Sequence, residues 1–346
     1  MNSHLGSEKS RGSHGTSFHK CSKGLLLVLA SQCLSILINT TARFLVAGAS
    51  NVHPFQLLNV RMLITLVLCG AYQLYRWNDD VFPGPKPIRG LLMIRSAGGI
   101  LGAVGFYRKT TFSSLQYLPL AEATILNFLA PLGSRLAIAF LSGNRISKAE
   151  GFSIFFSFTG VILVSKPAFL LSKSSGQMEQ GIMSPLGFAL AMLGAFGGAC
   201  AYTTISVIGT RCHPLTSVMY FAGGLFITTS IAMSTLPNAT FTFALPVSSW
   251  LMILLVGILG VQMDYLLTLG LSDDQSPHGI NMIYLQVVMT FIADWVVWST
   301  IPDIISILGG VLVVVGIVAI GYSQDSSRKF EQEGFEALGQ DDTGNA

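Results

Sequence analysis

The chain has 346 residues, of which 51% are hydrophobic and only 11% are charged, and its mean hydropathy is +0.60. Soluble domains carry about 25% charged residues, so this composition excludes an ordinary soluble protein. The net charge of +3 is spread along the chain without a basic stripe, which argues against nucleic acid as a partner and leaves the lipid bilayer.

Apolar segments need ~20 residues each to cross the hydrocarbon layer of a bilayer. Ten such segments follow one another, at about 24–47, 54–76, 89–111, 117–141, 149–171, 184–207, 214–236, 248–270, 277–299 and 302–322. They predict an all-α polytopic membrane protein with ten transmembrane helices. The polar ends, 1–23 and 323–346, predict disordered tails, of which the second is acidic. The cysteines lack metal-ligand spacing, so we expect no metal and no cofactor.

The placement of Lys and Arg predicts the orientation, because cytosolic segments of membrane proteins are rich in both. Most of these residues fall on the inner side if the N-terminus is cytosolic. Both termini are therefore expected in the cytosol, in an integral multi-pass protein of the plasma membrane or of an endomembrane (ER or Golgi). Arg108 and Lys109 oppose this assignment. The sequon at Asn238 falls on the outer side, as a glycan site or as a chance match.

The polar segment 172–183 divides the chain into two halves of five spans, 24–171 and 184–322. A shift of 156 residues, the separation of Gly160 and Gly316, places the fourth and fifth spans on the ninth and tenth without a gap. A second copy with an odd number of spans enters the membrane inverted. We therefore predict two inverted five-helix repeats, the architecture of secondary transporters, with a binding site between them near mid-membrane.

Polar residues share one face of the fourth span and the equivalent face of the ninth. At ~100° per residue these faces hold Asn127, Pro131, Ser134 and Arg135 in the fourth span, and Gln286, Thr290 and Asp294 in the ninth. Such residues normally face the bundle interior or a water-filled cavity, so we predict that they line a substrate pathway between the halves. The proline also frees a carbonyl in mid-span, either for a ligand or at a purely structural kink.

Other charged residues lie within the predicted spans. Glu122 lies off the polar face and is either a proton-coupling carboxylate or an interfacial group that suits the helix dipole. Asp264 is the proton-coupling candidate of the second half. Arg61, like Arg135, either binds substrate or pairs with a carboxylate. Arg95 lies near the predicted cytosolic side, where its side chain can snorkel to the interface, and a structural role is expected.

Glycines at close helical spacing predict tight helix packing in the third span (Gly98, Gly102 and Gly105) and in the sixth (Gly194 and Gly198).

Four segments carry a family resemblance: SLQYLPLAEATILNFLAP at 114–131, GVILVSKP at 160–167, YLQVVMTFIADW at 284–295 and LGGVLVVVGIVAI at 308–320. Over about residues 24–322 the chain resembles the EamA-type drug/metabolite transporter superfamily, particularly its solute-carrier-family-35 G-like branch. The resemblance implies ten helices in two inverted repeats, a pathway lined by spans one to four and six to nine, and export or exchange of small metabolites. Two departures are Gly143-Asn144, where many relatives have Gly-Glu, and Glu122, where the branch often has Asp.

The leading prediction is a secondary-active transporter that moves a small polar or anionic metabolite by alternating access. The rival functions are a non-transporting membrane scaffold or regulator and a membrane-embedded enzyme. No catalytic motif and no P-loop occur in the sequence, so no enzymatic activity, no catalytic residue and no ATP-driven transport are expected. The expected partners are a small-molecule solute and the lipid bilayer, and a homodimer stays open.

Overall fold

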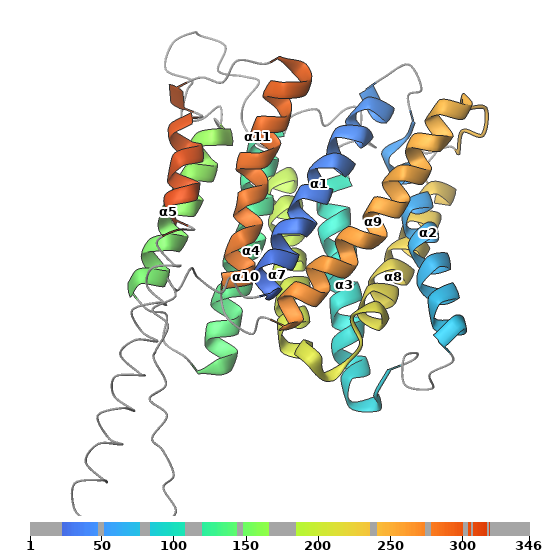
Figure 1. Ribbon diagram of the computed structural model, residues 1–346, viewed down its shortest axis with the longest axis horizontal. Helices are drawn as coiled ribbons and strands as arrows, with labels where there is room; N and C mark the ends of the chain where they lie inside the picture. Colours follow the sequence, from blue (N-terminus) through green and yellow to red (C-terminus); the bar gives the residue numbers. More distant parts are fainter. Residues whose placement is uncertain are drawn as a thin grey trace, which may run out of the picture.

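The computed structural model describes residues 23–47, 52–76, 84–107, 120–143, 148–165, 185–235, 241–273, 278–299, 304–305, 307–316 and 318. Every regular element in these ranges is a helix (Figure 1). The predicted linker 172–183, the acidic tail 323–346, the sequon at Asn238 and nearly all of the N-terminal tail lie outside the described residues.

The helices follow the predicted spans closely. They are α1 Lys23–Ala47, α2 Pro54–Arg76, α3 Arg89–Tyr107, α4 Leu120–Ser142, α5 Lys148–Ser165, α7 Pro185–Ile208, α8 Pro214–Thr235, α9 Val247–Asp273 and α11 Leu285–Trp298, with a last apolar segment at Ile307–Gly316. Short elements join them: α10 His278–Asn281 and the 3-10 turns η1 Lys86–Ile88, η3 Gly209–Arg211 and η4 Met282–Tyr284. Proline opens α2, α7 and α8, where its fixed φ suits a helix and its missing N–H costs nothing.

Five of the described helical segments are long and apolar enough to cross a membrane: Lys23–Val46, Pro54–Tyr75, Met192–Arg211, Pro214–Thr235 and Val247–Ser272. Shorter apolar helices are found at Leu129–Leu141, Gly151–Gly160, Met282–Val297 and Ile307–Gly316. Large apolar side chains are exposed on many of these helices, including Tyr75 and Phe140 at 88% each. A surface of this kind is expected to contact lipid, as in a multi-pass membrane protein.

Helices from the first part of the chain pack mainly on helices from the second part. α3 packs on α7 and α8, α1 on α9 and α11, α2 on α8 and α9, and α4 on α7. Figure 1 shows α1 lying beside both α9 and α11, although the three helices are far apart in sequence.

Glycine permits the closest of these helix crossings. A Cβ atom added to Gly197 of α7 would lie 2.6 Å from the carbonyl oxygen of Gly98 and 2.7 Å from the nitrogen of Gly102, both in α3. A Cβ atom on Gly270 of α9 would lie 2.8 Å from the carbonyl oxygen of Gly24 in α1. The prediction of tight packing is confirmed at Gly98, where an added Cβ atom would lie 2.7 Å from the carbonyl oxygen of Gly197. A Cβ atom on Gly102 would make ordinary contacts instead, 3.7 Å from the nitrogen of Gly198 and 3.8 Å from the carbonyl oxygen of Gly194.

α5 crosses the segment Ile307–Gly316 through a reciprocal pair of contacts. A Cβ atom on Gly160 would lie 2.5 Å from the carbonyl oxygen of Gly309 and 2.8 Å from the nitrogen of Val313. A Cβ atom on Gly316 would lie 2.8 Å from the carbonyl oxygen of Ser153 and 2.9 Å from the nitrogen of Ser157. A shift of 156 residues converts each contact into the other.

Asn59 joins α2 to α8 through its side-chain amide. Its Nδ2 donates to the hydroxyl of Thr229 at 2.9 Å and to that of Ser230 at 2.8 Å. Replacing Asn59 by alanine is expected to lower the free energy of unfolding by about 1 kcal/mol, the usual range for hydrogen bonds between membrane helices. The change is read as a lower thermal midpoint of the detergent-solubilised protein. Ser234→Ala, at an exposed position of α8, is the matched control and is expected to leave the midpoint unchanged.

Candidate functional site

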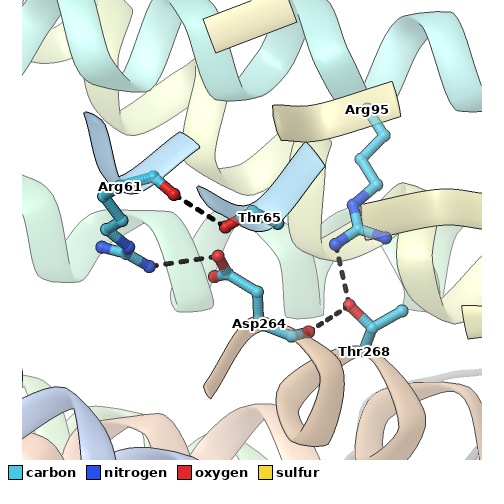
Figure 2. Close-up of polar contacts among 5 residues, drawn as sticks. All are labelled: Arg61, Thr65, Arg95, Asp264 and Thr268. Carbon is cyan, nitrogen blue, oxygen red and sulfur yellow. Dashed lines mark hydrogen bonds and ion pairs between the residues drawn. The ribbon is translucent and has the colours of Figure 1, made fainter. Parts of the chain in front are cut away.

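An ion pair joins α2 to α9 within the helix bundle (Figure 2). Nη2 of Arg61 lies 3.1 Å from Oδ2 of Asp264, and the two side chains are only 16% and 7% exposed. The sequence proposed these residues for separate roles, Arg61 in the substrate pathway and Asp264 in proton coupling. The structure brings them together, in agreement with the alternative that Arg61 pairs with a carboxylate.

The face of α9 that meets Arg61 is shaped to hold it. A Cβ atom on Gly260 would lie 2.5 Å from Nε of Arg61, so the glycine leaves the space that the arginine side chain occupies. Asp264, one helical turn further on, binds the guanidinium. On α2, the Thr65 hydroxyl donates to the backbone carbonyl of Arg61 at 3.0 Å. α9 therefore positions the Arg61 side chain, through Gly260 at Cγ, Cδ and Nε and through Asp264 at Nη2.

Arg95 of α3 forms the second half of this network (Figure 2). It donates through Nη2 to the hydroxyl of Thr268 at 2.8 Å and through Nη1 to the hydroxyl of Ser217 on α8. Its guanidinium lies 5.6 Å from the ring centroid of Phe221. The Thr268 hydroxyl in turn donates to the backbone carbonyl of Asp264 at 2.6 Å. A chain of hydrogen bonds thus connects Arg95 to the residue that pairs with Arg61.

The prediction that Arg95 snorkels to the interface is wrong, because its side chain is only 3% exposed and is directed into the bundle. Two hydroxyl groups and an aromatic ring solvate the guanidinium there and replace the water that it would have found at the interface. A structural role for Arg95 fits these contacts.

The charges of this network do not cancel among the described side chains. Arg61 and Arg95 contribute two positive charges, and Asp264 is the carboxylate that lies between them (Figure 2). The described hydrogen-bond partners of Arg95 are neutral hydroxyls. Guanidinium groups bind carboxylates and phosphates in a bidentate manner, so an excess of positive charge here favours an anionic or strongly polar ligand.

The predicted polar face of α4 is buried where its side chains are described. Ser134 is 0% and Arg135 4% exposed, and Pro131 lies inside the helix. The hydroxyl of Thr203 on α7 donates to that of Ser134 at 3.2 Å. The backbones of Glu122 and Asn127 belong to α4, but their side chains lie outside the described ones.

The predicted face of the ninth span meets α1. Nε2 of Gln286 on α11 donates to the hydroxyl of Ser35 at 2.8 Å. Thr290 is half-buried on the same helix, and the side chain of Asp294 lies outside the described ones. The described candidates are therefore distributed over three helix contacts, α2 with α9, α4 with α7, and α11 with α1. A common pathway between them stays a prediction.

The sequence reasoning did not select the polar partners on the opposing helices, which are Ser35, Thr203, Ser217 and Thr268. It also did not select Gly260, which leaves the space for Arg61. One signal was available, because Gly260, Asp264 and Thr268 repeat every four residues along α9 and so share a face. Within the described residues, no group of three or more His, Cys, Asp and Glu side chains could hold a metal ion.

Comparison with known proteins gives the family. Residues 22–166 match the EamA-like transporter family. The chain is 32% identical to the probable transporter vicT of Bipolaris victoriae, over 94% of this chain and 93% of that protein. It is 23% identical to solute carrier family 35 member G1 of Homo sapiens, over 82% of this chain and 75% of that protein. A crystal structure with 20% identity superposes with a TM-score of 0.63 over 86% of this chain and 96% of the other, which shows a shared fold.

Proposed function

This chain belongs to the EamA-like transporter family, and on that premise we propose that it is a secondary-active carrier that moves a small polar or anionic metabolite across its membrane by alternating access. The observation that carries the proposal is the network of Arg61, Asp264 and Arg95 in the bundle interior. Charged side chains are costly inside a membrane and usually mark a solute or ion pathway. Two guanidiniums around one carboxylate favour a solute with a carboxylate or phosphate group.

The proposed architecture is ten spans in two inverted repeats, 24–171 and 184–322, joined by the linker 172–183. The reciprocal contacts of α5 with Ile307–Gly316 support it, because they interchange under the 156-residue shift found in the sequence. The helix contacts support it too. If α1 to α4 correspond to α7, α8, α9 and α11, the contact of α1 with α9 corresponds to that of α3 with α7, and the contact of α1 with α11 to that of α4 with α7.

The proposal places both termini in the cytosol and the site near mid-membrane, in the plasma membrane or an endomembrane. The pathway would be lined by Arg61, the faces of α4 and α11, and their partners on α1 and α7. Glu122 and Asp264 are its proton-coupling candidates. The two relatives described above are named as a probable transporter and a solute carrier, which favours transport over an enzymatic activity or a purely scaffolding role.

Uptake into proteoliposomes tests the proposal. Labelled organic anions, amino acids and nucleotide sugars are offered as pools, with and without a pH gradient. The expected result is saturable uptake from one pool, lost in Arg135→Ala and in Arg61→Ala but kept in the surface control Ser234→Ala. Loss of the pH dependence in Glu122→Gln would identify the proton site. No uptake from any pool by correctly folded protein would contradict the proposal and favour a scaffold.

A further inference from the structure

The ion pair of Arg61 with Asp264 joins the two halves of the chain. Arg61 belongs to α2, which precedes the predicted linker, and Asp264 belongs to α9, which follows it. In a carrier built from two repeats, these are the units that move against one another during transport. The pair therefore lies across the boundary at which a conformational change takes place.

Asp264 is the one hydrogen-bond and ion-pair partner of the Arg61 side chain among the described residues. The buried Nε of Arg61 packs on Gly260 and makes no hydrogen bond there. Without Asp264, the guanidinium would lie in a largely buried position with no counter-ion among the described side chains. Breaking a buried ion pair by removing one partner is costly because the remaining charge is uncompensated.

This cost matters most in the occluded intermediate of a carrier, where the site is closed to water on both sides. An unpaired guanidinium would then raise the barrier to every passage through the occluded form. A guanidinium that keeps a carboxylate partner would lower the barrier to the occluded form. The pair of Arg61 with Asp264 supplies that compensation from within the protein.

Resting on the proposed carrier function, we infer that Asp264 is the resident counter-ion of Arg61 and enables the empty carrier to change between its inward-open and outward-open forms. In the loaded step, a carboxylate or phosphate group of the solute replaces Asp264 on Arg61 by a bidentate contact. The charge of the displaced Asp264 stays compensated by Arg95, the second guanidinium beside it (Figure 2). The solute and Asp264 thus alternate as partners of one guanidinium. The protein consequently performs net transport of an anionic solute, because its empty form returns without a solute.

Arg95 keeps Asp264 available for this alternation. The Thr268 hydroxyl, held by Arg95, donates to the backbone carbonyl of Asp264. Ser217 holds the same guanidinium from α8. The backbone of α9 next to Asp264 is therefore fixed independently of the ion pair, so the carboxylate stays close to Arg61 when a solute takes its place. Arg95 is a positioning residue in this scheme.

Single-molecule energy transfer between fluorescent labels, in proteoliposomes free of organic anions, tests the inference. One label pair, Tyr75→Cys in the first half with Arg211→Cys in the second, reports on the end of the bundle where α2 ends and α8 begins (Figure 1). A second pair, Phe44→Cys in the first half with Ser299→Cys in the second, reports on the opposite end, where α1 and α11 end. Both pairs are placed in a background in which the five native cysteines are replaced.

We expect the background protein to exchange between two transfer efficiencies at each end without solute. Asp264→Asn is expected to slow this exchange ~10-fold or more, because it leaves the Arg61 charge unpaired. Asp264→Glu keeps the charge and is expected to retain the exchange. The double variant Arg61→Gln/Asp264→Asn removes both charges and is expected to restore it, which a general folding defect would not do.

Unaltered exchange in Asp264→Asn would overturn the inference. A background protein that is static without solute, and takes up labelled solute only into liposomes preloaded with unlabelled solute, would also overturn it, because that carrier would be an obligate exchanger. Neither result would affect the proposed function. A protein without uptake from any pool and without exchange would instead contradict the proposed function itself. If Asp264→Asn does not fold, the double variant decides. Exchange in the double variant that is slower than in the background protein would then overturn the inference.

Discussion

Replacing Gly197 by leucine is expected to prevent stable folding, and replacing it by alanine is expected to destabilise the protein by about 1–3 kcal/mol, the usual cost of overpacking. A Cβ atom at this position would lie 2.6 Å from the Gly98 carbonyl oxygen and 2.6 Å from Cβ of Leu101. The first of these atoms belongs to the backbone, which cannot move aside as a flexible side chain would. α3 and α7 would have to separate along their whole contact. The yield of monodisperse protein after size-exclusion chromatography and the thermal midpoint measure the effect.

Gly70→Ala is the matched control, since Gly70 also lies within a transmembrane helix but has no atom within 4 Å of an added Cβ. Alanine is the better helix former by ~1 kcal/mol, so this variant is expected to be neutral or slightly more stable. Equal midpoints for Gly197→Ala and Gly70→Ala would show that the close crossing of α3 and α7 is absent in the membrane protein.

Arg95→Ala is expected to lower the free energy of unfolding by about 3 kcal/mol, since each hydrogen bond to a charged group contributes about 1.5–3 kcal/mol. The variant removes the guanidinium from Ser217 and Thr268 and leaves a cavity beside Phe221. Three helices, α3, α8 and α9, lose a common contact. Unfolding of the detergent-solubilised protein gives the change in stability directly.

Arg95→Lys separates the charge from the shape of the side chain. Lysine keeps the positive charge but lacks the planar fork that reaches two hydroxyls on different helices, so an intermediate loss of stability is expected. A double-mutant cycle of Arg95→Ala with Thr268→Val isolates the contact between α3 and α9, because neighbours in one network are not additive. Additive effects of the two substitutions would contradict the network.

The family resemblance read from the sequence was correct, because it rests on local patterns that need no fold. The motif at 114–131 and the glycine-rich segments carry the resemblance, and the match of residues 22–166 to the EamA-like family agrees with it. The positions of the helices were predictable for a similar reason. Each span is a continuous apolar run, and a backbone inside lipid must satisfy its hydrogen bonds within the segment, which selects a helix.

The pairing of side chains between helices could not be predicted in the same way. Arg61 and Asp264 are separated by 203 residues, and the sequence placed one in the pathway and the other in proton coupling. Their contact depends on Gly260, because this residue has no side chain and the arginine can therefore lie against α9. Arg95 shows the same limit. Its position in the span was compatible with snorkelling to the interface, but its side chain binds hydroxyls of α8 and α9 inside the bundle.

The sequence by itself determined that this protein is helical, lies in a membrane and belongs to a transporter family, since hydropathy and motifs are properties of single segments. Only the tertiary structure decided which charges are neighbours. Inside a bilayer, apolar helix surfaces gain little by choosing one another over lipid, so their pairing is set by close steric fit and by polar groups that need partners. Steric fit and polar pairing both depend on the surfaces of two helices at once, so the sequence of one segment does not determine them.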